Sequence, residues 1–155
     1  MRALAHRMND IKLNTLILNR FCGEEYYSIQ SASWSIWDGR TLCVEMWFEE
    51  GLNLHEDTDY LAQEPGWELY FDVPSITDEM LKPGMILGDT ENIEDETHFY
   101  YCEHLPTYNN KLEILGREDD KILFKITGEC CDVNYYDGSK GSDTLEITAW
   151  IDEEN

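Results

Sequence analysis

The stretch from residue 88 to residue 104, GDTENIEDETHFYYCEH, concentrates side chains that can bind a metal or carry charge. It holds six carboxylates, two histidines and one cysteine. If residues 98–105 form one strand, His98, Cys102 and His104 share a face, because successive side chains of a strand alternate. Cys102 and His104 would then lie roughly 6.5 to 7 Å apart, which suits one zinc ion if a neighbouring element supplied further ligands.

A metal site is the less favoured interpretation of this stretch. The chain has no CxxC motif among its five cysteines and no second pair of histidine or cysteine residues two positions apart. The acidic segment HEDTD at 55–59 places Asp57 and Asp59 two apart, as calcium loops do, but it lacks the glycine at the sixth position of an EF-hand. We expect no cofactor. A small metal protein or enzyme using the 98–104 segment remains the alternative.

Motifs for other kinds of catalysis are missing from the chain. There is no GxSxG elbow and no GxxxxGK phosphate loop, and acids are so abundant that close carboxylate pairs arise by chance. Cys130 and Cys131 are adjacent, so in a strand one would pack in the core and the other would face the surface. We therefore expect a protein that is not an enzyme.

Negative charge dominates the chain and is unevenly distributed along it. Thirty-three acidic residues stand against eleven lysines and arginines, for a formal charge of −22. Between Arg40 and Lys111 the only basic residue is Lys82, against seventeen acids, so this interval carries −16. Such a field attracts a cationic partner and repels nucleic acid and anionic lipid. We expect a basic protein partner, with no direct contact to nucleic acid and none to a membrane.

The predicted partner-binding surface combines carboxylates from two polar loops, on the assumption that the fold brings both to one side. The residues are Glu56, Asp57, Asp59, Asp89, Glu91, Glu94, Asp95 and Glu96. The five tryptophans and nine tyrosines exceed what a core of this size needs. Several should face outward, where aromatic rings beside carboxylates suit a protein interface.

Alternating hydrophobic patterns predict a chain built mainly of strands. Two aromatic and β-branched runs flank Asp38-Gly39 and predict a hairpin. In the second run Leu42, Val44, Met46 and Phe48 fall on one side and polar residues fall on the other, which is typical of a half-buried sheet. A second hairpin is predicted at 111–128, with Leu112 and Ile114 in one layer with Ile122, Phe124 and Ile126. Residues 67–73 and 98–105 are expected as single strands.

Helices are expected to be few. Residues 75–81, with Ser75 as the cap, predict one short helix, and residues 55–63 predict a turn or two in a long connection. Residues 11–21 fit a strand or a short helix, with the strand preferred. The fold class is mainly β: an antiparallel sheet or β-sandwich with one or two short helices, in a single domain at 10–155 preceded by an N-terminal arm at 1–9.

The segment DDKILFKITGECCDVNYYDGSKGSDTLEITAWI, two alternating strands around a polar loop, resembles the small acidic immunity proteins of bacterial toxin systems. The resemblance covers the last third of the chain and transfers no catalytic or binding residue. It implies a cytoplasmic antitoxin without enzymatic activity that clamps its cognate toxin, often a basic nuclease, and blocks the active site. A DNA mimic that occupies the basic groove of a nuclease or repressor is a further alternative.

The expected location is the cytoplasm. The N-terminal segment MRALAHRMNDIKL has no apolar run of the length that a signal peptide requires, and no later window approaches a membrane span. The odd number of cysteines and the missing CxxC spacing speak against a disulfide framework. The sequence does not fix the oligomeric state.

Overall fold

The computed structural model describes residues 12–49, 51, 64–89, 97–101 and 103–155. In these residues ten strands join in one sheet with the order β5-β8-β9-β10-β1-β2-β3-β4-β6-β7, and neighbours in this order are antiparallel. The strands are β1 (Thr15–Arg20), β2 (Gly23–Trp37), β3 (Thr41–Phe48), β4 (Gly66–Asp72), β5 (Ile86–Gly88), β6 (His98–Tyr101), β7 (Glu103–Pro106), β8 (Tyr108–Glu118), β9 (Lys121–Cys131) and β10 (Ser142–Glu153). The predicted fold class, mainly antiparallel β with few helices, is confirmed.

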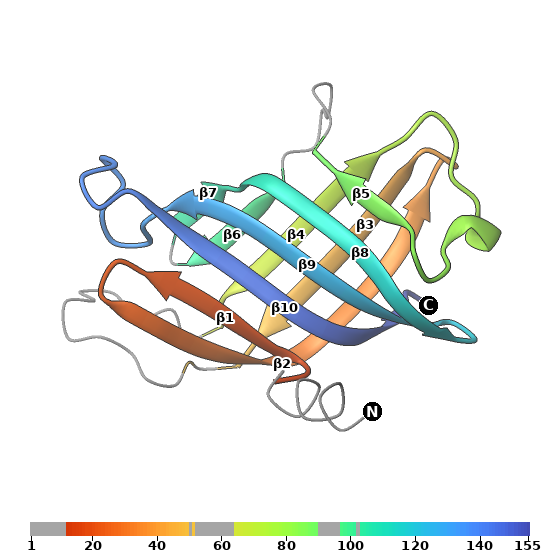
Figure 1. Cartoon of the computed structure of the whole chain (residues 1–155), viewed down its shortest axis with the longest axis horizontal. Coiled ribbons are helices and arrows are strands. Elements are labelled where there is room, and N and C mark those ends of the chain that lie inside the picture. Colours follow the sequence, from red (N-terminus) through yellow and green to blue (C-terminus); the bar gives the residue numbers. More distant parts are fainter. Residues whose placement is uncertain (1–11, 50, 52–63, 90–96, 102) are drawn as a thin grey trace.

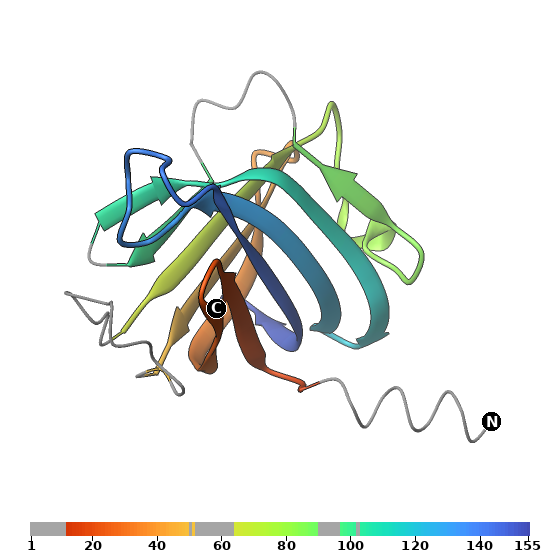
Figure 2. The same cartoon turned by 60° about the vertical axis from the view of Figure 1, so that its left-hand side comes forward.

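The sheet folds over itself into two layers around the core. In Figure 1 the strands β8, β9 and β10 cross in front of β2, β3 and β4, and Figure 2 shows how strongly the sheet curves. β10 pairs with β9 along its length and with β1 through residues 144–146. Its last residues, Asp152 and Glu153, pair in parallel with Ser33 and Trp34 of β2. This contact joins the two layers at one side.

The long strand β2 belongs to two pairings. Its first part, up to Ser28, pairs with β1, and the rest pairs with β3 from Ile29 onward. The register shifts between Ile29 and Ser31. Because a bulge bends a strand and increases its twist, this irregularity lets one strand turn from the first pairing into the second.

Alternation along the strands fills the space between the layers. The β3 residues Leu42, Val44, Met46 and Phe48 are buried, as predicted. Across from Met46 lies Trp67 of β4, which is also fully buried. The tryptophans therefore divide as expected: Trp34 and Trp67 are buried, whereas Trp37, Trp47 and Trp150 retain exposure.

The two predicted hairpins are confirmed. Asp38 and Gly39 have φ angles of 52° and 64°, and the Arg40 N–H donates to the Trp37 carbonyl at 3.0 Å. Two central residues with positive φ define the hairpin turn that matches strand twist. The second hairpin joins β8 and β9, in which Leu112 lies opposite Ile126.

Two local predictions need correction. The helix expected at 75–81 is one 3-10 turn at Asp78–Met80, preceded by Thr77 and without a side-chain capping bond, so Ser75 is not the cap. Pro83 disfavours the α conformation at Lys82, so a helix here could not continue past Leu81. The preference for a strand within 11–21 is confirmed by β1. The arm at 1–9 and the helical turns at 55–63 lie outside the described residues.

The single strand expected at 98–105 is wrong. The segment forms a hairpin of β6 and β7, in which Tyr100 lies opposite His104 and Phe99 lies opposite Leu105. The sequence between β6 and β7 contains no glycine, proline or asparagine, the residues that mark most turns, so the local pattern indicated one continuous strand.

Candidate functional site

Most of the predicted partner-binding acids lie outside the described residues. These are Glu56, Asp57, Asp59, Glu91, Glu94, Asp95 and Glu96. The eighth, Asp89, is exposed, and its carboxylate accepts hydrogen bonds from the Asn110 backbone N–H at 2.9 Å and from Asn110 Nδ2 at 2.8 Å. Asp89 thus fastens the end of β5 to β8. That the two acidic loops meet on one side stays a prediction.

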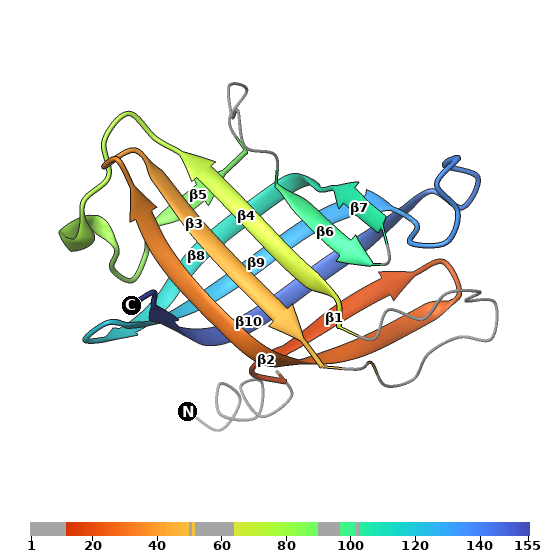
Figure 3. The ribbon, with the colours of Figure 1, turned by 180° about the vertical axis from the view of Figure 1, so that it is seen from behind.

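The described residues carry a second acidic surface, on the outer side of the layer formed by β2, β3, β4, β6 and β7. Figure 3 views the molecule from this side. We call it the acidic-aromatic face and define it by Trp37, Glu45, Trp47, Glu68, Tyr70, Asp72 and Tyr100. Among the described residues of these five strands there is no lysine or arginine. The alternation in β3 and β4 predicted that these side chains share a side.

Two carboxylates face each other at the centre of the acidic-aromatic face. Glu45 of β3 lies directly across from Glu68 of β4, an arrangement that destabilises a sheet. Trp47 Nε1 donates to Glu45 at 2.7 Å, and the Tyr70 hydroxyl donates to Glu68 at 2.8 Å. Each carboxylate is therefore oriented by an aromatic residue two positions along its own strand and faces a like charge.

Aromatic pairs flank the two glutamates. Trp37 and Tyr70 have ring centroids 5.4 Å apart, and Trp47 and Tyr100 have centroids 6.4 Å apart. Trp47 lies over Gly66 of β4: a Cβ added there would come within 2.5 Å of the indole ring. Because Gly66 has no side chain, the Trp47 ring can lie across β4 at this position.

The field of this face acts on a thiol beneath it. Cys43 lies between the outward residues of β3 but is buried. Burial, followed by the negative charges of Glu45, Glu68 and Glu154, raises the pKa of Cys43 to about 12. The negative charges of Glu45 and Glu68 therefore both act on the Cys43 thiol. Glu154, which follows β10 and whose N–H donates to the Trp34 carbonyl at 2.8 Å, contributes a third negative charge.

The two histidines considered as metal ligands lie at the border of the acidic-aromatic face. The β6–β7 hairpin brings the rings of His98 and His104 to 4.9 Å between centroids, and His98 Nε2 lies 3.8 Å from Glu68 Oε2. Cys102 is outside the described residues. Within the part of the chain that is described, no group of three or more His, Cys, Asp and Glu side chains is placed to hold a metal ion.

The outer side of the other layer differs in charge. On β8, β9 and β10 three acids face lysines: Glu113 lies across from Lys125, and Lys121 lies between Glu118 and Asp152. Opposite charges at facing positions stabilise a sheet. Lys121 and Lys125 are thus matched to carboxylates of their own layer.

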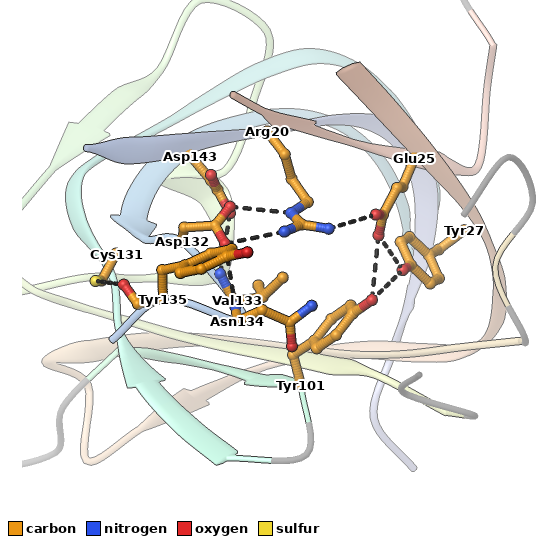
Figure 4. A network of polar contacts seen from close by, with 10 residues as sticks. All are labelled: Arg20, Glu25, Tyr27, Tyr101, Cys131, Asp132, Val133, Asn134, Tyr135 and Asp143. Carbon is orange, nitrogen blue, oxygen red and sulfur yellow. Dashed lines mark hydrogen bonds and ion pairs between the residues drawn. The ribbon is translucent and has the colours of Figure 1, made fainter. Parts of the chain in front are cut away.

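A buried ionic network, drawn in Figure 4, closes one end of the core. Arg20 ends β1 at an inward position and is fully buried at its side chain. Its Nε and Nη2 donate to the two Asp132 oxygens at 2.9 and 3.0 Å, and its Nη1 donates to Glu25 at 3.1 Å. Burial would lower the pKa of Arg20, but the bonds and charges of Asp132 and Glu25 raise it, so the guanidinium stays charged.

Two tyrosines extend the network into the core. The hydroxyls of Tyr27 and Tyr101 donate to Glu25 Oε1 at 2.7 and 3.2 Å. Burial raises the pKa of both phenols, so they remain neutral donors. The network links β1, β2, β6 and the β9–β10 connection, and its named groups largely bond one another, which is the arrangement of a structural support.

Sequence reasoning did not identify this network, although the strand pattern contains a signal for it. Arg20 continues the inward row of Leu16 and Leu18, and Glu25 precedes Tyr27 in the inward row of β2. A charged residue at a core position needs a buried partner. The partner Asp132 is more than a hundred residues away, so local pattern could not name it.

Among the described residues no helix is long and apolar enough to cross a membrane. Comparison of the chain with protein-family models, with curated proteins and with solved structures found no match.

Proposed function

We propose that the chain is a non-catalytic acidic binding protein whose partner is a basic protein, and that it docks through the acidic-aromatic face. An immunity or inhibitor protein that blocks a basic toxin in the cytoplasm is the specific form of this proposal. The loop carboxylates predicted from the sequence, such as Glu94, Asp95 and Glu96, would extend the same electrostatic attraction.

One observation carries the proposal: Glu45 and Glu68 face each other, without a lysine or arginine among the described residues of their layer. This arrangement costs stability in the free protein. A guanidinium or ammonium group from a partner would relieve the repulsion on binding. The rings of Trp37, Trp47 and Tyr70 supply rigid contact area beside the charges, as the central residues of many interfaces do.

The DNA-mimic alternative receives less support from the same face. A mimic requires carboxylates at phosphate-like intervals, roughly 6 to 7 Å apart along a strand. In the described strands of this layer, no two outward carboxylates stand two residues apart; Glu68 and Asp72, for instance, are separated by four positions. The facing glutamates suit a single cation better than a run of phosphate sites.

The first experiment captures the partner. Tagged full-length chain is incubated with an extract of its host at low and at high salt, and eluted proteins are identified by mass spectrometry. We expect one basic protein that is retained at low salt and released as screening increases. An eluate without an enriched basic protein, or with acidic proteins only, would contradict the proposal.

The second experiment locates the contact on the purified partner. The variant Glu45→Gln/Glu68→Gln should slow association about tenfold at low salt, because steering depends on the local field. The matched control is Glu129→Gln/Glu146→Gln, which changes the net charge equally on the other layer. If both variants slowed association equally, the effect would come from net charge alone, and the contact could not be assigned to the acidic-aromatic face.

A further inference from the structure

Asp143 is a buried acid whose hydrogen bonds are incomplete. It lies at an inward position of β10, across from Cys130 of β9, and is fully buried. Its Oδ2 accepts the Val133 backbone N–H at 3.2 Å, whereas its Oδ1 has no donor among the described residues. An ionised carboxylate in this position would leave a buried charge without a partner, which is strongly unfavourable.

The charges around Asp143 do not balance. Asp143 lies beside Asp132 of the β9–β10 connection and within the field of Arg20 of β1. Arg20 also bonds Glu25 of β2 on its other side. Cys130 on β9 and the two phenols of the network are neutral, because burial raises their pKa values. Three carboxyl groups thus surround one guanidinium in a site closed to water, and a proton is the smallest cation that reduces the excess.

We propose that Asp132 and Asp143 share one proton at neutral pH, and that its loss loosens the connection at 132–141 from the end of the sheet. The geometry places the proton on Asp143. Asp132 already accepts two bonds from Arg20 and one from the Asn134 N–H at 3.1 Å. A protonated Asp143 can donate to Asp132, which gives the remaining oxygen a partner.

The pKa values of the two acids agree with this assignment. Burial, the hydrogen bond with Asp132 and the charge of Asp132 raise the pKa of Asp143 to about 8. Burial opposes ionisation of Asp132, but the bonds from Arg20, Asp143 and the Asn134 N–H outweigh it and lower the pKa of Asp132. Two neighbouring carboxyls whose pKa values separate in this way behave as one acid and one base.

The proton stabilises the ends of the connection at 132–141. Asp143 holds the Val133 N–H and Asp132 holds the Asn134 N–H. Beyond them the Tyr135 carbonyl accepts from Cys131 Sγ at 3.1 Å, and the Tyr135 ring packs edge-on against Phe21, with centroids 5.6 Å apart. When Asp143 ionises, two adjacent carboxylates repel each other. We therefore expect these contacts to weaken first.

The sign of the pH dependence follows from linkage. An unfolded aspartate has a pKa of about 3.9, so above that value the folded chain holds a proton that the unfolded chain has lost. The stabilisation by protonated Asp143 is complete below about pH 4 and decreases as the pH rises toward 8. Asp132 acts in the opposite sense, since its pKa is lowered: its contribution is lost as the pH falls below 4.

Carboxyl ¹³C NMR of the full chain between pH 5 and 10 tests the proposal without any partner. We expect the Asp143 Cγ signal to titrate with a midpoint near 8, and the Val133 and Asn134 amide signals to change with the same midpoint. Midpoints below 5 for every aspartate would overturn the shared proton. Titration of Asp143 without any change in the two amides would overturn its effect on the connection.

The variant Asp143→Asn mimics the protonated acid, since its amide can donate to Asp132. Its Val133 and Asn134 signals should stay constant from pH 7 to 9. The control Asp137→Asn removes an exposed carboxylate of the same connection, which accepts the Ser139 N–H at 2.9 Å, and should titrate like the unaltered chain. If Asp143→Asn does not fold, the titration of the unaltered chain decides alone.

Discussion

The protein holds carboxylates in two different settings, the exposed pair of the acidic-aromatic face and the buried set around Arg20. At the surface Glu45 faces Glu68, and no lysine or arginine of that layer's described residues balances them. In the interior Asp132 and Glu25 bond directly to a guanidinium. Water screens exposed like charges but not buried ones. The buried set therefore has to be neutralised within the molecule, whereas water can screen the surface pair.

We expect a division of roles, in which the buried set supports stability and the surface pair supports association. Removing a charge from the buried set should lower the free energy of unfolding. Binding should change only to the extent that less of the protein is folded. Removing a charge from the surface pair should alter binding and leave the fold intact or slightly more stable.

The largest effect is expected from Arg20→Met. The substitution leaves Asp132 and Glu25 buried without their cation, which costs about 3 to 5 kcal/mol of unfolding free energy when one partner of a buried ion pair is removed. Urea denaturation at pH 7 measures the loss. The loss should shrink at pH 4.5, where protonation relieves the uncompensated carboxylates. Lys111→Met, on the exposed side of β8 across from Thr127, is the control and should change stability by less than about 0.5 kcal/mol. Equal losses for both would contradict the division.

The second effect concerns association and tests the loop acids predicted from the sequence. Reversing the charge at Glu94, Asp95 and Glu96 should slow association with the basic partner about tenfold or more at low salt. The difference from the unaltered chain should nearly vanish at 1 M salt, where the screening length is about 3 Å. Stopped-flow association rates measure it. An unchanged rate at low salt would confine the steering field to the acidic-aromatic face.

The strand pattern made much of this architecture predictable. Alternation placed Leu42, Val44 and Met46 in the core, and Asp38-Gly39 marked the β2–β3 turn, because local sterics decide both features. The β6–β7 hairpin was not predictable from pattern, since the sequence between its two strands contains no typical turn residue. The identity of the residues that face each other across the core also depends on pairings between strands distant in sequence.

The candidate site shows the same limit. The outward position of Glu45 follows from its place in β3, but its opposition to Glu68 depends on the register with β4. Likewise Arg20 is recognisable as a charge in an inward row, whereas Asp132 becomes its partner only when the β9–β10 connection returns to β1. Composition gave the excess of acid, and only the fold separates acids that face water from acids that face an arginine.

A third, smaller effect is expected from Gly66→Ala. The added methyl would meet the Trp47 ring at 2.5 Å, so the indole must turn and give up its bond to Glu45. Overpacking of this kind costs about 1 kcal/mol or more. The Trp47 Nε1–H signal in NMR should move, and association should slow as Glu45 loses its orientation. Gly88→Ala is the control, since its nearest contact is an ordinary 3.7 Å. An unchanged Trp47 Nε1–H signal would show that Gly66 does not determine the position of the ring.

The smallest effect, and the sharpest test of the comparison, is expected from Glu68→Gln. The substitution keeps an oxygen that can accept from Tyr70 and removes the repulsion with Glu45, so the free protein should gain about 0.2 to 1 kcal/mol of unfolding free energy. The unfolding free energy is measured by urea denaturation at pH 8. Glu146→Gln is the control: Glu146 faces Thr127 and Ile17, so it meets no like charge across the sheet and should show no gain. A loss of stability in Glu68→Gln would mean that the carboxylate supports the fold, and the facing glutamates would no longer indicate a surface kept for a partner.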